Sequence, residues 1–124
     1  MSGATYDTGM LIALDRRRPR AMAVHEWLAE ERIRVTLPWV VVAEFWRGRT
    51  DRRDAILRSI EIEAPSVSLA KTAGDALAAV KRATVVDAIV MASAALRGDV
   101  VYTSDLDDLG LLQRHFPSVR LLAV

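Results

Sequence analysis

Four acidic residues, far apart in the sequence, are the side chains best suited to chemistry in this 124-residue chain. They are Asp7, Glu44, Asp87 and Asp105, and Asp105 is followed closely by Asp107 and Asp108. Carboxylates with no histidine or cysteine among them favour hard cations, so such a group would select Mg²⁺ or Mn²⁺ over Zn²⁺. Two carboxylates about 5 Å apart repel each other by roughly 3 kcal/mol at an effective dielectric constant of about 20, which a cation would relieve. A divalent ion held in this way can activate water and neutralise charge on a phosphodiester.

Three of these acids, Asp7, Asp87 and Asp105, lie where predicted strands end or predicted helices begin. Asp7 and Asp105 each follow a strand, and Asp87 lies in the first turn of a helix. The predicted elements that carry them span residues 3–8, 84–98 and 99–103. In a parallel sheet, strand ends and the following helix starts share one edge, where binding sites form. We therefore expect the three aspartates to meet at that edge.

Helix capping is an alternative explanation for the same aspartates. Asp7 and Asp105 would cap the helices that follow them, and Thr84 and Asp87 have the spacing of a capping box. Negative side chains near a helix start are stabilising in general. Taken singly, each aspartate is explained by capping, so a chemical interpretation rests on the whole group.

Glu44 is not explained by capping. It lies late in a helix predicted from Pro38 to about Arg47, where the helix dipole does not favour an anion. Apolar residues flank it, with Phe45 and Trp46 directly after it. A carboxylate in apolar surroundings is costly unless its charge is compensated, and a metal ion would do this. A salt bridge to Arg47 and a position facing solvent are the alternatives.

Strands and helices alternate along the rest of the chain. Further helices are predicted over residues 9–14, 19–31, 51–60, 68–82 and 106–113, and further strands over residues 33–37, 62–64 and 119–124. Asp51 and Ser68 are the expected caps of two of these helices. Strands separated by helices imply an α/β fold with a mostly parallel central sheet and helices on both faces. The length and the lack of a linker predict a single domain over residues 1–124.

The composition is that of a soluble globular protein, with 52% hydrophobic and 27% charged residues. The longest apolar stretches, residues 37–46 and 84–96, are too short to span a membrane and each contains a carboxylate. No signal peptide is visible, and the absence of cysteine is compatible with a reducing cytoplasm, which is the location we expect. The two histidines, His25 and His115, are isolated, and we expect them on the surface or at helix ends.

The net charge of +1 does not by itself indicate nucleic-acid binding, but the basic residues are mostly arginines in two clusters. Guanidinium groups match the geometry of phosphate oxygens better than ammonium groups do. Arg47 is the best single candidate for a phosphate contact, although support of its own helix is an alternative. Solvated loops of a protein from a GC-rich genome are the other explanation of the clusters, which are Arg16, Arg17, Arg18 and Arg20, and Arg47, Arg49, Arg52 and Arg53.

Four segments around the acids carry a resemblance to a known family. They are residues 6–14 (YDTGMLIAL), 42–48 (VAEFWRG), 86–92 (VDAIVMA) and 101–109 (VYTSDLDDL). In order and spacing they resemble the acidic motifs of PIN-domain ribonucleases, particularly the VapC-like toxins of type II toxin–antitoxin pairs. The resemblance covers nearly the whole chain and implies a PIN-like three-layer α/β/α fold.

The resemblance also implies roles for individual residues. Asp7, Glu44, Asp87 and Asp105 correspond to catalytic metal ligands for Mg²⁺ or Mn²⁺, and Asp108 to a position that can serve a second ion. Thr8, Ser104 and Arg47 are the expected substrate contacts, and Thr103 a supporting hydrogen-bonding residue. The implied activity is that of an endoribonuclease that uses metal-activated water and leaves a 5′-phosphate. The implied partners are an RNA substrate, an antitoxin protein and a second copy in a homodimer.

Two other classes of function compete with this one. A catalytically silent PIN-like module that binds only RNA or a protein would have the same fold. A phosphoacceptor signalling domain also gathers aspartates at the edge of a parallel sheet, but it would need an acidic pair after the first strand and a lysine after the last. The chain has a single acid, Asp7, at the first place, and its lysines, Lys71 and Lys81, lie far from the last.

Overall fold

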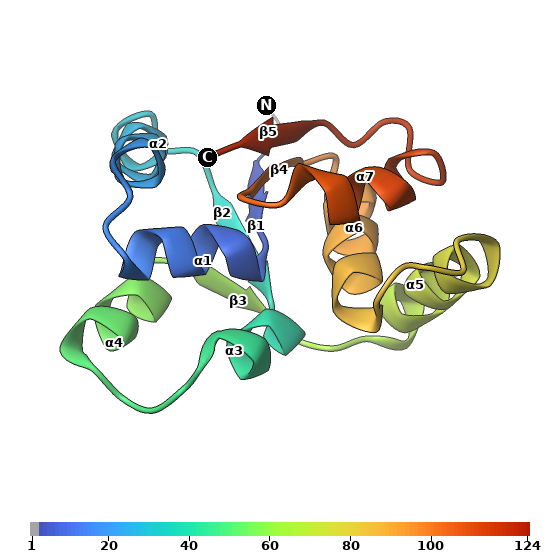
Figure 1. Cartoon of the computed structure of the whole chain (residues 1–124), viewed down its shortest axis with the longest axis horizontal. Coiled ribbons are helices and arrows are strands. Elements are labelled where there is room, and N and C mark those ends of the chain that lie inside the picture. Colours follow the sequence, from blue (N-terminus) through green and yellow to red (C-terminus); the bar gives the residue numbers. More distant parts are fainter. Residues whose placement is uncertain (1–2) are drawn as a thin grey trace.

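The computed structural model describes residues 3–124, and within them five parallel strands form one sheet in the order β3-β2-β1-β4-β5 (Figure 1). The strands are β1 (Ala4–Tyr6), β2 (Val35–Pro38), β3 (Glu61–Glu63), β4 (Val100–Thr103) and β5 (Leu121–Ala123). The expectation of a mostly parallel sheet is confirmed, and every pairing in it is parallel.

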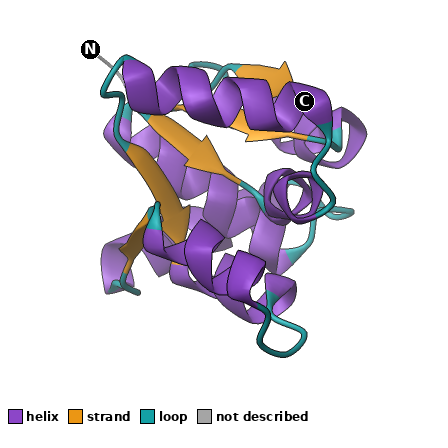
Figure 2. Cartoon of the chain, turned by 90° about the vertical axis from the view of Figure 1, so that its left-hand side faces the viewer, coloured by secondary structure: helices purple, strands orange, loops and turns teal. Residues whose placement is uncertain are grey.

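Helices cover both faces of this sheet. They are α1 (Thr8–Asp15), α2 (Pro19–Glu30), α3 (Trp39–Phe45), α4 (Asp51–Arg58), α5 (Val67–Ala79), α6 (Val85–Arg97) and α7 (Leu106–Gln113). In Figure 1, α1, α2 and α4 lie on one side of the strands and α5, α6 and α7 on the other. Figure 2 shows the strands enclosed between helices. This division follows from right-handed crossovers, because the chain reverses its direction across the sheet after β3. The predicted three-layer α/β/α architecture is confirmed.

The core lies along the central strand and α6. All residues of β1 are buried, as expected for a central parallel strand covered on both faces. The stretch from Ala88 to Ala94 in α6 is also buried, because this helix contacts β1, β2 and β4 and lies against α5 and α7. No helix within residues 3–124 has the combination of length and apolar character that crossing a membrane requires.

Most helix boundaries agree with the local sequence signals, and two predicted caps are wrong. Helix α6 begins after Thr84 and ends at Gly98, whose positive φ of 75° suits a glycine. Helix α4 is capped by Thr50, with Asp51 in its first turn. Helix α5 is capped by Ser66, whose hydroxyl accepts the N–H of Leu69, so the predicted cap two residues later lies within the helix.

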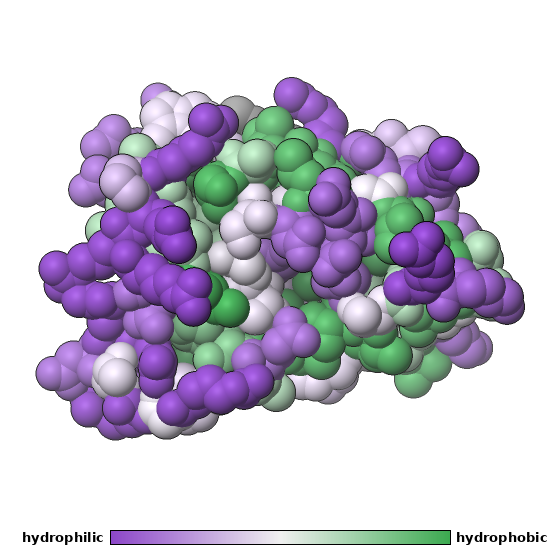
Figure 3. Space-filling view, viewed as in Figure 1, coloured by the Kyte–Doolittle hydropathy of each residue, from purple (hydrophilic) through white to green (hydrophobic). Residues whose placement is uncertain are grey.

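The strand order places one cleft at the carboxyl edge of the sheet. From β1 the chain crosses toward β2, whereas β4, on the other side of β1, is reached only after the reversal. Crevices in parallel sheets form at such a switch point, outside the carboxyl ends of the two strands. In the space-filling view, hydrophilic surface covers the side of α2 and α4 and a second area near the centre, between α1 and α7 (Figure 3). A binding site is therefore expected at the carboxyl ends of β1 and β4.

Candidate active site

A cavity of about 370 Å³ at this edge brings together every predicted site residue except Arg47 and the supporting Thr103. Five carboxylates face it, and no basic side chain lines it. Its lining consists of Asp7, Thr8, Gly9, Ile12, Glu44, Thr84, Asp87, Ser104, Asp105, Asp108 and Leu109. These residues come from the ends of β1 and β4 and from α1, α3, α6 and α7. Segments spread over most of the sequence thus converge on one acidic cavity.

Asp7 is the most buried of the five acids, with 5% of its surface exposed. It caps α1, because Oδ1 accepts the N–H of Met10 at 2.8 Å, and its Oδ2 accepts the hydroxyl of Thr103 at 2.5 Å. Burial raises the pKa of Asp7 to about 6. The two hydrogen bonds oppose that shift, and the charges of Asp87 and Asp105 add to it. A carboxylate that is costly to ionise here would be stabilised by a cation.

Asp105 begins α7 on the other side of the cavity. Its backbone N–H donates to Thr103 Oγ1 at 2.8 Å, and its own Oδ1 accepts the N–H of Asp108 at 3.3 Å. Asp108 is exposed, and a side-chain hydrogen bond with Asp105, together with the charge of Asp105, raises the pKa of the Asp108 carboxyl. Both predicted caps, Asp7 and Asp105, are thus confirmed as caps, and both also face the cavity.

Asp87 occupies the first turn of α6 and is half-buried. Its backbone N–H donates to Thr84 Oγ1 at 3.2 Å, which confirms the threonine half of the expected capping arrangement. Burial is the main cause that raises the pKa of Asp87, and the charges of Asp108, Glu44 and Asp105 raise it further. The side-chain hydrogen bond with Thr84 lowers it in part. Capping and proximity to other acids therefore coexist at this residue.

Glu44 lies in the cavity wall, but the reason expected from the sequence is wrong. Its side chain is exposed rather than enclosed by the apolar residues of α3, because Val41 and Phe45 form the buried face of that helix. Its Oε1 accepts a hydrogen bond from Thr8 Oγ1. Among the described residues it takes part in no salt bridge. Packing of α3 against α1 and α6, not desolvation, brings Glu44 to the site.

Arg47 lies outside the cavity lining. Its Nη1 donates to the carbonyls of Trp46 at 2.9 Å and Ala43 at 3.3 Å, so it supports the end of α3. The rest of its cluster is engaged within the protein as well. Arg49 pairs with Asp51 and Asp54, Arg53 pairs with Asp15, and Arg52 donates to the Asp15 carbonyl. The geometry of this cluster therefore favours the alternative explanation, a structural role.

Gly9 is a site residue that the sequence reading did not single out. A Cβ at this position would lie 2.3 Å from Ser104 Oγ and 3.4 Å from Asp7 Oδ1. The first contact is too short for a real Cβ, and the backbone N of Ser104 would lie only 3.3 Å away, so a larger residue would have to displace the Ser104 hydroxyl. The available signal was a glycine in the first turn of a helix, directly after an acid and a threonine, where helix propensity gives no reason for it.

Neither histidine lines the acidic cavity. His25 is partly buried rather than on the surface, because the Tyr6 hydroxyl lies 2.8 Å from its Nδ1 and Ser59 Oγ lies 3.2 Å from its Nε2. Since Ser59 donates to the carbonyl of Ile56, Nε2 carries the proton and Nδ1 accepts from Tyr6. Burial lowers the pKa of His25, in keeping with a neutral ring. His115 is exposed, as expected.

The donor atoms of the cavity suit a hard cation. Carboxylate and hydroxyl oxygens are the ligands that Mg²⁺ and Mn²⁺ prefer, and the cavity offers no nitrogen or sulfur ligand from a side chain. Within residues 3–124, no three acidic or histidine side chains stand close enough together to form a ligand cluster as they are. The site thus fits a cation in chemistry, and its acids would have to draw together to hold one.

Comparisons with known proteins agree with this architecture. A family model described as the PIN domain matches residues 5–111. VapBC2 of Rickettsia felis, solved bound to a DNA fragment from its promoter, is similar in structure with a TM-score of 0.77, 14% identity and 98% coverage of both chains. A toxin–antitoxin complex from Klebsiella pneumoniae is similar with a TM-score of 0.73 and 22% identity, covering 94% of this chain and 95% of the other.

A third similar structure has higher identity. VapBC-5 of Mycobacterium tuberculosis, a member of the VapBC family of toxin–antitoxin systems, shares 25% identity over 100% of both chains with a TM-score of 0.62. Comparison with curated proteins gives no match. The family model spans all four acidic segments and most of the chain. On that match, with the fold and the acidic cavity in accord, this chain belongs to the PIN-domain family.

Proposed function

We propose that the chain is a metal-dependent endoribonuclease that acts as the toxin of a toxin–antitoxin pair. The observation that carries this proposal is the convergence of five carboxylates on one cavity without a basic residue in its wall. Capping accounts for Asp7 and Asp105, but it gives no reason for α1, α6 and α7 to present acids to the same space. The raised pKa values of Asp7, Asp87 and Asp108 support a site that requires positive charge.

Asp7, Glu44, Asp87 and Asp105 would hold Mg²⁺ or Mn²⁺, with Asp108 available for a second ion. When bound, the ion supplies an activated water and neutralises charge on the phosphate. In the hydrolysis that we propose, the water oxygen bonds to phosphorus and the bond from phosphorus to the 3′ oxygen breaks. The water loses a proton and the 3′ oxygen gains one, which leaves a 5′-phosphate and a 3′-hydroxyl.

Residues of the chain would prepare this site in defined ways. Thr103 fixes the direction of one Asp7 oxygen, and the Met10 N–H fixes the other. Thr8 holds Glu44 at the opposite wall. Ser104, packed against Gly9, places a hydroxyl between the acids and the adjoining surface. These hydrogen bonds orient ligands before a cation arrives, which lowers the cost of organising the site.

The toxin–antitoxin assignment rests on the kind of protein that the chain resembles. The similar structures from K. pneumoniae and M. tuberculosis are described as toxin–antitoxin proteins, and the R. felis structure shares the VapBC name with the second. We propose an antitoxin protein as the partner, RNA as the substrate and a homodimer as the assembly. A neighbouring short gene that encodes a DNA-binding domain with a basic, amphipathic tail would support the pairing.

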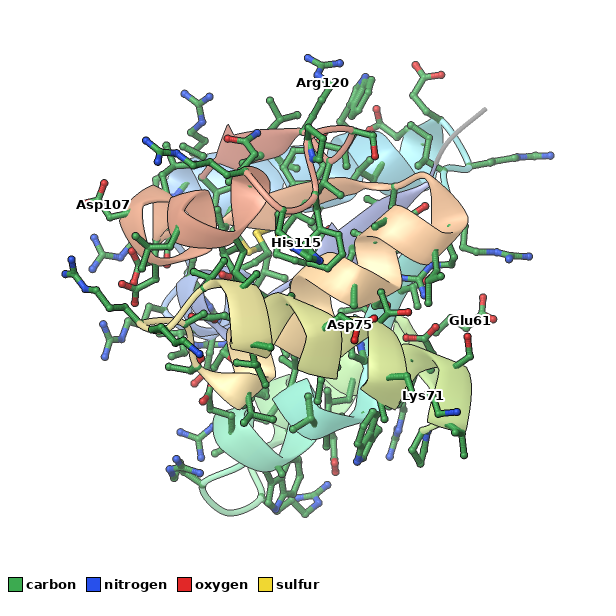
Figure 4. The ribbon with its side chains drawn as sticks, turned by 90° about the vertical axis from the view of Figure 1, so that its right-hand side faces the viewer. Glu61, Lys71, Asp75, Asp107, His115 and Arg120 are labelled. Carbon is green, nitrogen blue, oxygen red and sulfur yellow. The ribbon has the colours of Figure 1, made fainter. Side chains whose placement is uncertain are left out.

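The test is cleavage of a mixed, structured RNA pool by purified protein with Mn²⁺, with Mg²⁺ and with EDTA. We expect cutting that requires a divalent ion and disappears in Glu44→Gln and in Asp7→Asn. Because Glu44 is exposed, its replacement should change the free energy of unfolding by no more than about 0.5 kcal/mol. Asp75→Asn is the matched control, since Asp75 is exposed on α5, outside the cavity (Figure 4).

The decisive comparison is between Glu44→Gln and Asp75→Asn at equal protein concentration. Full activity in Glu44→Gln would remove this residue from the mechanism. A wild-type protein that binds metal but cuts no RNA in the pool would contradict the proposed activity and favour a silent binding module. Products should carry a 5′-phosphate, which ligation to an adaptor that requires this end would detect.

A further inference from the structure

A second cavity of about 460 Å³ adjoins the acidic one and has the opposite charge. The two cavities share Gly9, Ile12 and Ser104 in their walls, so they lie side by side. The rest of the second lining is Ala13, Arg16, Arg18, Pro19, Arg20 and Val124. No acidic side chain lines it. We call it the arginine groove, because three arginines form its polar wall.

Within residues 3–124, no acidic group pairs with an arginine of this groove. Among the described residues, the side chains of Arg16 and Arg18 take part in no salt bridge and no hydrogen bond. Arg20 donates through Nε to the carbonyl of Ala123 at 3.0 Å, which fixes its direction without neutralising it. The other arginine cluster is engaged with carboxylates and carbonyls of the protein itself. The guanidinium groups of the groove are therefore open to a ligand, whereas those of the other cluster already bind groups of the protein.

The backbone at the end of α1 holds these arginines in a fixed arrangement. The N–H groups of Arg16, Arg17 and Arg18 donate to the carbonyls of Ile12, Leu14 and Ala13 at 2.9, 3.0 and 2.9 Å. Arg17 takes a φ of 54°, in the left-handed region that favours glycine. An arginine at such a position costs free energy that glycine would not, and the cost is tolerated in an ordered turn beside the cavity.

We propose that the arginine groove binds phosphates of the RNA strand next to the bond that is cut, so that it positions the substrate. This inference rests on the nuclease function proposed above and adds the path of the strand. A strand whose reacting phosphate lies at the acids carries further phosphates at each neighbouring nucleotide. Those that leave the acidic cavity past Gly9 and Ser104 enter a wall of guanidinium groups, which bind phosphate oxygens in a forked geometry.

An acidic segment of a partner protein is the competing occupant of the groove. It would account for the arginines, but not for their position beside a cavity of five carboxylates, which would repel the same segment. A nucleic acid accounts for both halves, because its reacting phosphate requires cations at the acids and its other phosphates require arginines. RNA is thus the occupant that the arrangement favours.

The test measures binding separately from cleavage. A labelled, mixed-sequence single-stranded RNA of about 20 nucleotides is titrated with protein in EDTA, and fluorescence anisotropy gives the Kd at several salt concentrations. The test variant is Arg16→Gln/Arg18→Gln, and the charge-matched control is Arg32→Gln/Arg120→Gln. Arg32 and Arg120 are exposed and precede β2 and β5, at the edge of the sheet opposite the acids, and Arg120 projects away from the molecule (Figure 4).

Each phosphate contact on a single strand adds about 0.7 to the slope of log K against log salt, which is about fivefold in affinity at 0.1 M. We expect Arg16→Gln/Arg18→Gln to weaken binding about 25-fold and to reduce the slope by about 1.4. The control pair should change both values much less. Arg16→Lys/Arg18→Lys should retain the slope, because it retains the charge. Thermal melting of all variants should match the wild type, since these side chains are exposed.

The outcomes separate this proposal from the nuclease proposal. Equal weakening by the two glutamine pairs, or an unchanged Kd in the test pair, would overturn the arginine groove as an RNA site and leave it to an acidic protein. Wild-type RNA cleavage alongside that result would leave the nuclease intact. Loss of binding in the test pair, without cleavage by any protein, would support the groove and contradict the nuclease. No RNA binding by the wild type would overturn the groove directly.

Discussion

The Thr103 hydroxyl donates a hydrogen bond to Asp7 Oδ2, although the two residues are 96 positions apart. The same hydroxyl oxygen accepts the N–H of Asp105 at 2.8 Å. One threonine therefore ties the carboxyl ends of β1 and β4 together and sets the position of two acids. This contact is also the strongest local compensation for the charge of Asp7, whose burial disfavours ionisation.

Removing the charge of Asp7 should stabilise the protein in the absence of metal. The pKa of this carboxyl is about 6 in the folded protein and 3.8 unfolded, so the folded state binds the extra proton between these values. Stability of the wild type should accordingly fall as pH rises from about 4 to 6, by at most about 3 kcal/mol. Asp7→Asn should lack this loss and should melt several degrees higher in EDTA at pH 7.5.

The measurement is thermal melting of the wild type and Asp7→Asn in EDTA from pH 4 to pH 8. The two melting temperatures should converge toward pH 4, where the wild-type carboxyl is protonated in both states. Asparagine retains an oxygen that can accept the Met10 N–H, so the helix cap is kept, and its amide N–H can donate to Thr103 Oγ1, which reverses the direction of that contact. A variant that is less stable than the wild type at pH 7.5 would contradict the unfavourable burial of this charge.

Divalent ions should raise the stability of the wild type. An ion that binds only the folded state at 100 times its Kd adds about 2.7 kcal/mol to the free energy of unfolding. We expect Mg²⁺ or Mn²⁺ at millimolar concentration to raise the melting temperature at pH 7.5, with KCl of equal ionic strength as the reference. The effect should shrink near pH 5, because protons then compete with the ion for Asp7. An unchanged melting curve at pH 7.5 would count heavily against a shared site.

Replacing Gly9 with alanine should displace residues of the acidic cavity. In Gly9→Ala the new Cβ would overlap Ser104 Oγ, and relief of the overlap would move Ser104 or Asp7. The Ser104 hydroxyl can rotate to relieve part of the overlap, and helix propensity favours alanine by up to about 1 kcal/mol, so we expect the free energy of unfolding to fall by no more than about 1–2 kcal/mol, together with a large loss of RNA cleavage. Chemical denaturation and the RNA assay measure the two effects.

Gly74→Ala provides the matched control for this substitution. Gly74 lies in α5, where an added Cβ meets nothing within 4 Å. Helix propensity alone should make this variant up to about 1 kcal/mol more stable, with unchanged cleavage. If Gly9→Ala behaves in the same way as Gly74→Ala, the close packing of the acidic cavity against Ser104 has no functional consequence.

Features encoded by local sequence were predictable. The caps at Asp7, Thr84 and Asp105 follow from side chains that accept nearby backbone N–H groups, and α7 has the predicted bounds of residues 106–113. The acids were predicted to meet because a parallel sheet gathers strand ends and helix starts at one edge. Their convergence on one cavity agrees with this reasoning.

Features that depend on tertiary contacts were not predictable. The apolar run in α3 suggested a buried Glu44, but packing selects only one face of that helix, and Glu44 lies on another. Whether an arginine is free or engaged depends on neighbours distant in sequence, as the pairing of Arg53 with Asp15 shows. The packing of Gly9 against Ser104 joins two segments whose contact no local pattern records.

The two outermost strands of the sheet have a consequence for self-association. Strands β3 and β5 are three residues long, and β3 carries Glu61 and Glu63, which pair with Arg34 and Arg97 at 3.4 and 2.6 Å. At the other border, Arg20 donates a hydrogen bond to the carbonyl of Ala123 in β5. Strands this short, one of them charged and the other with a carbonyl already engaged, are poor templates for edge-to-edge pairing. The borders of the sheet therefore disfavour its extension by a strand of a second copy, and the homodimer proposed above would be expected to use other surfaces.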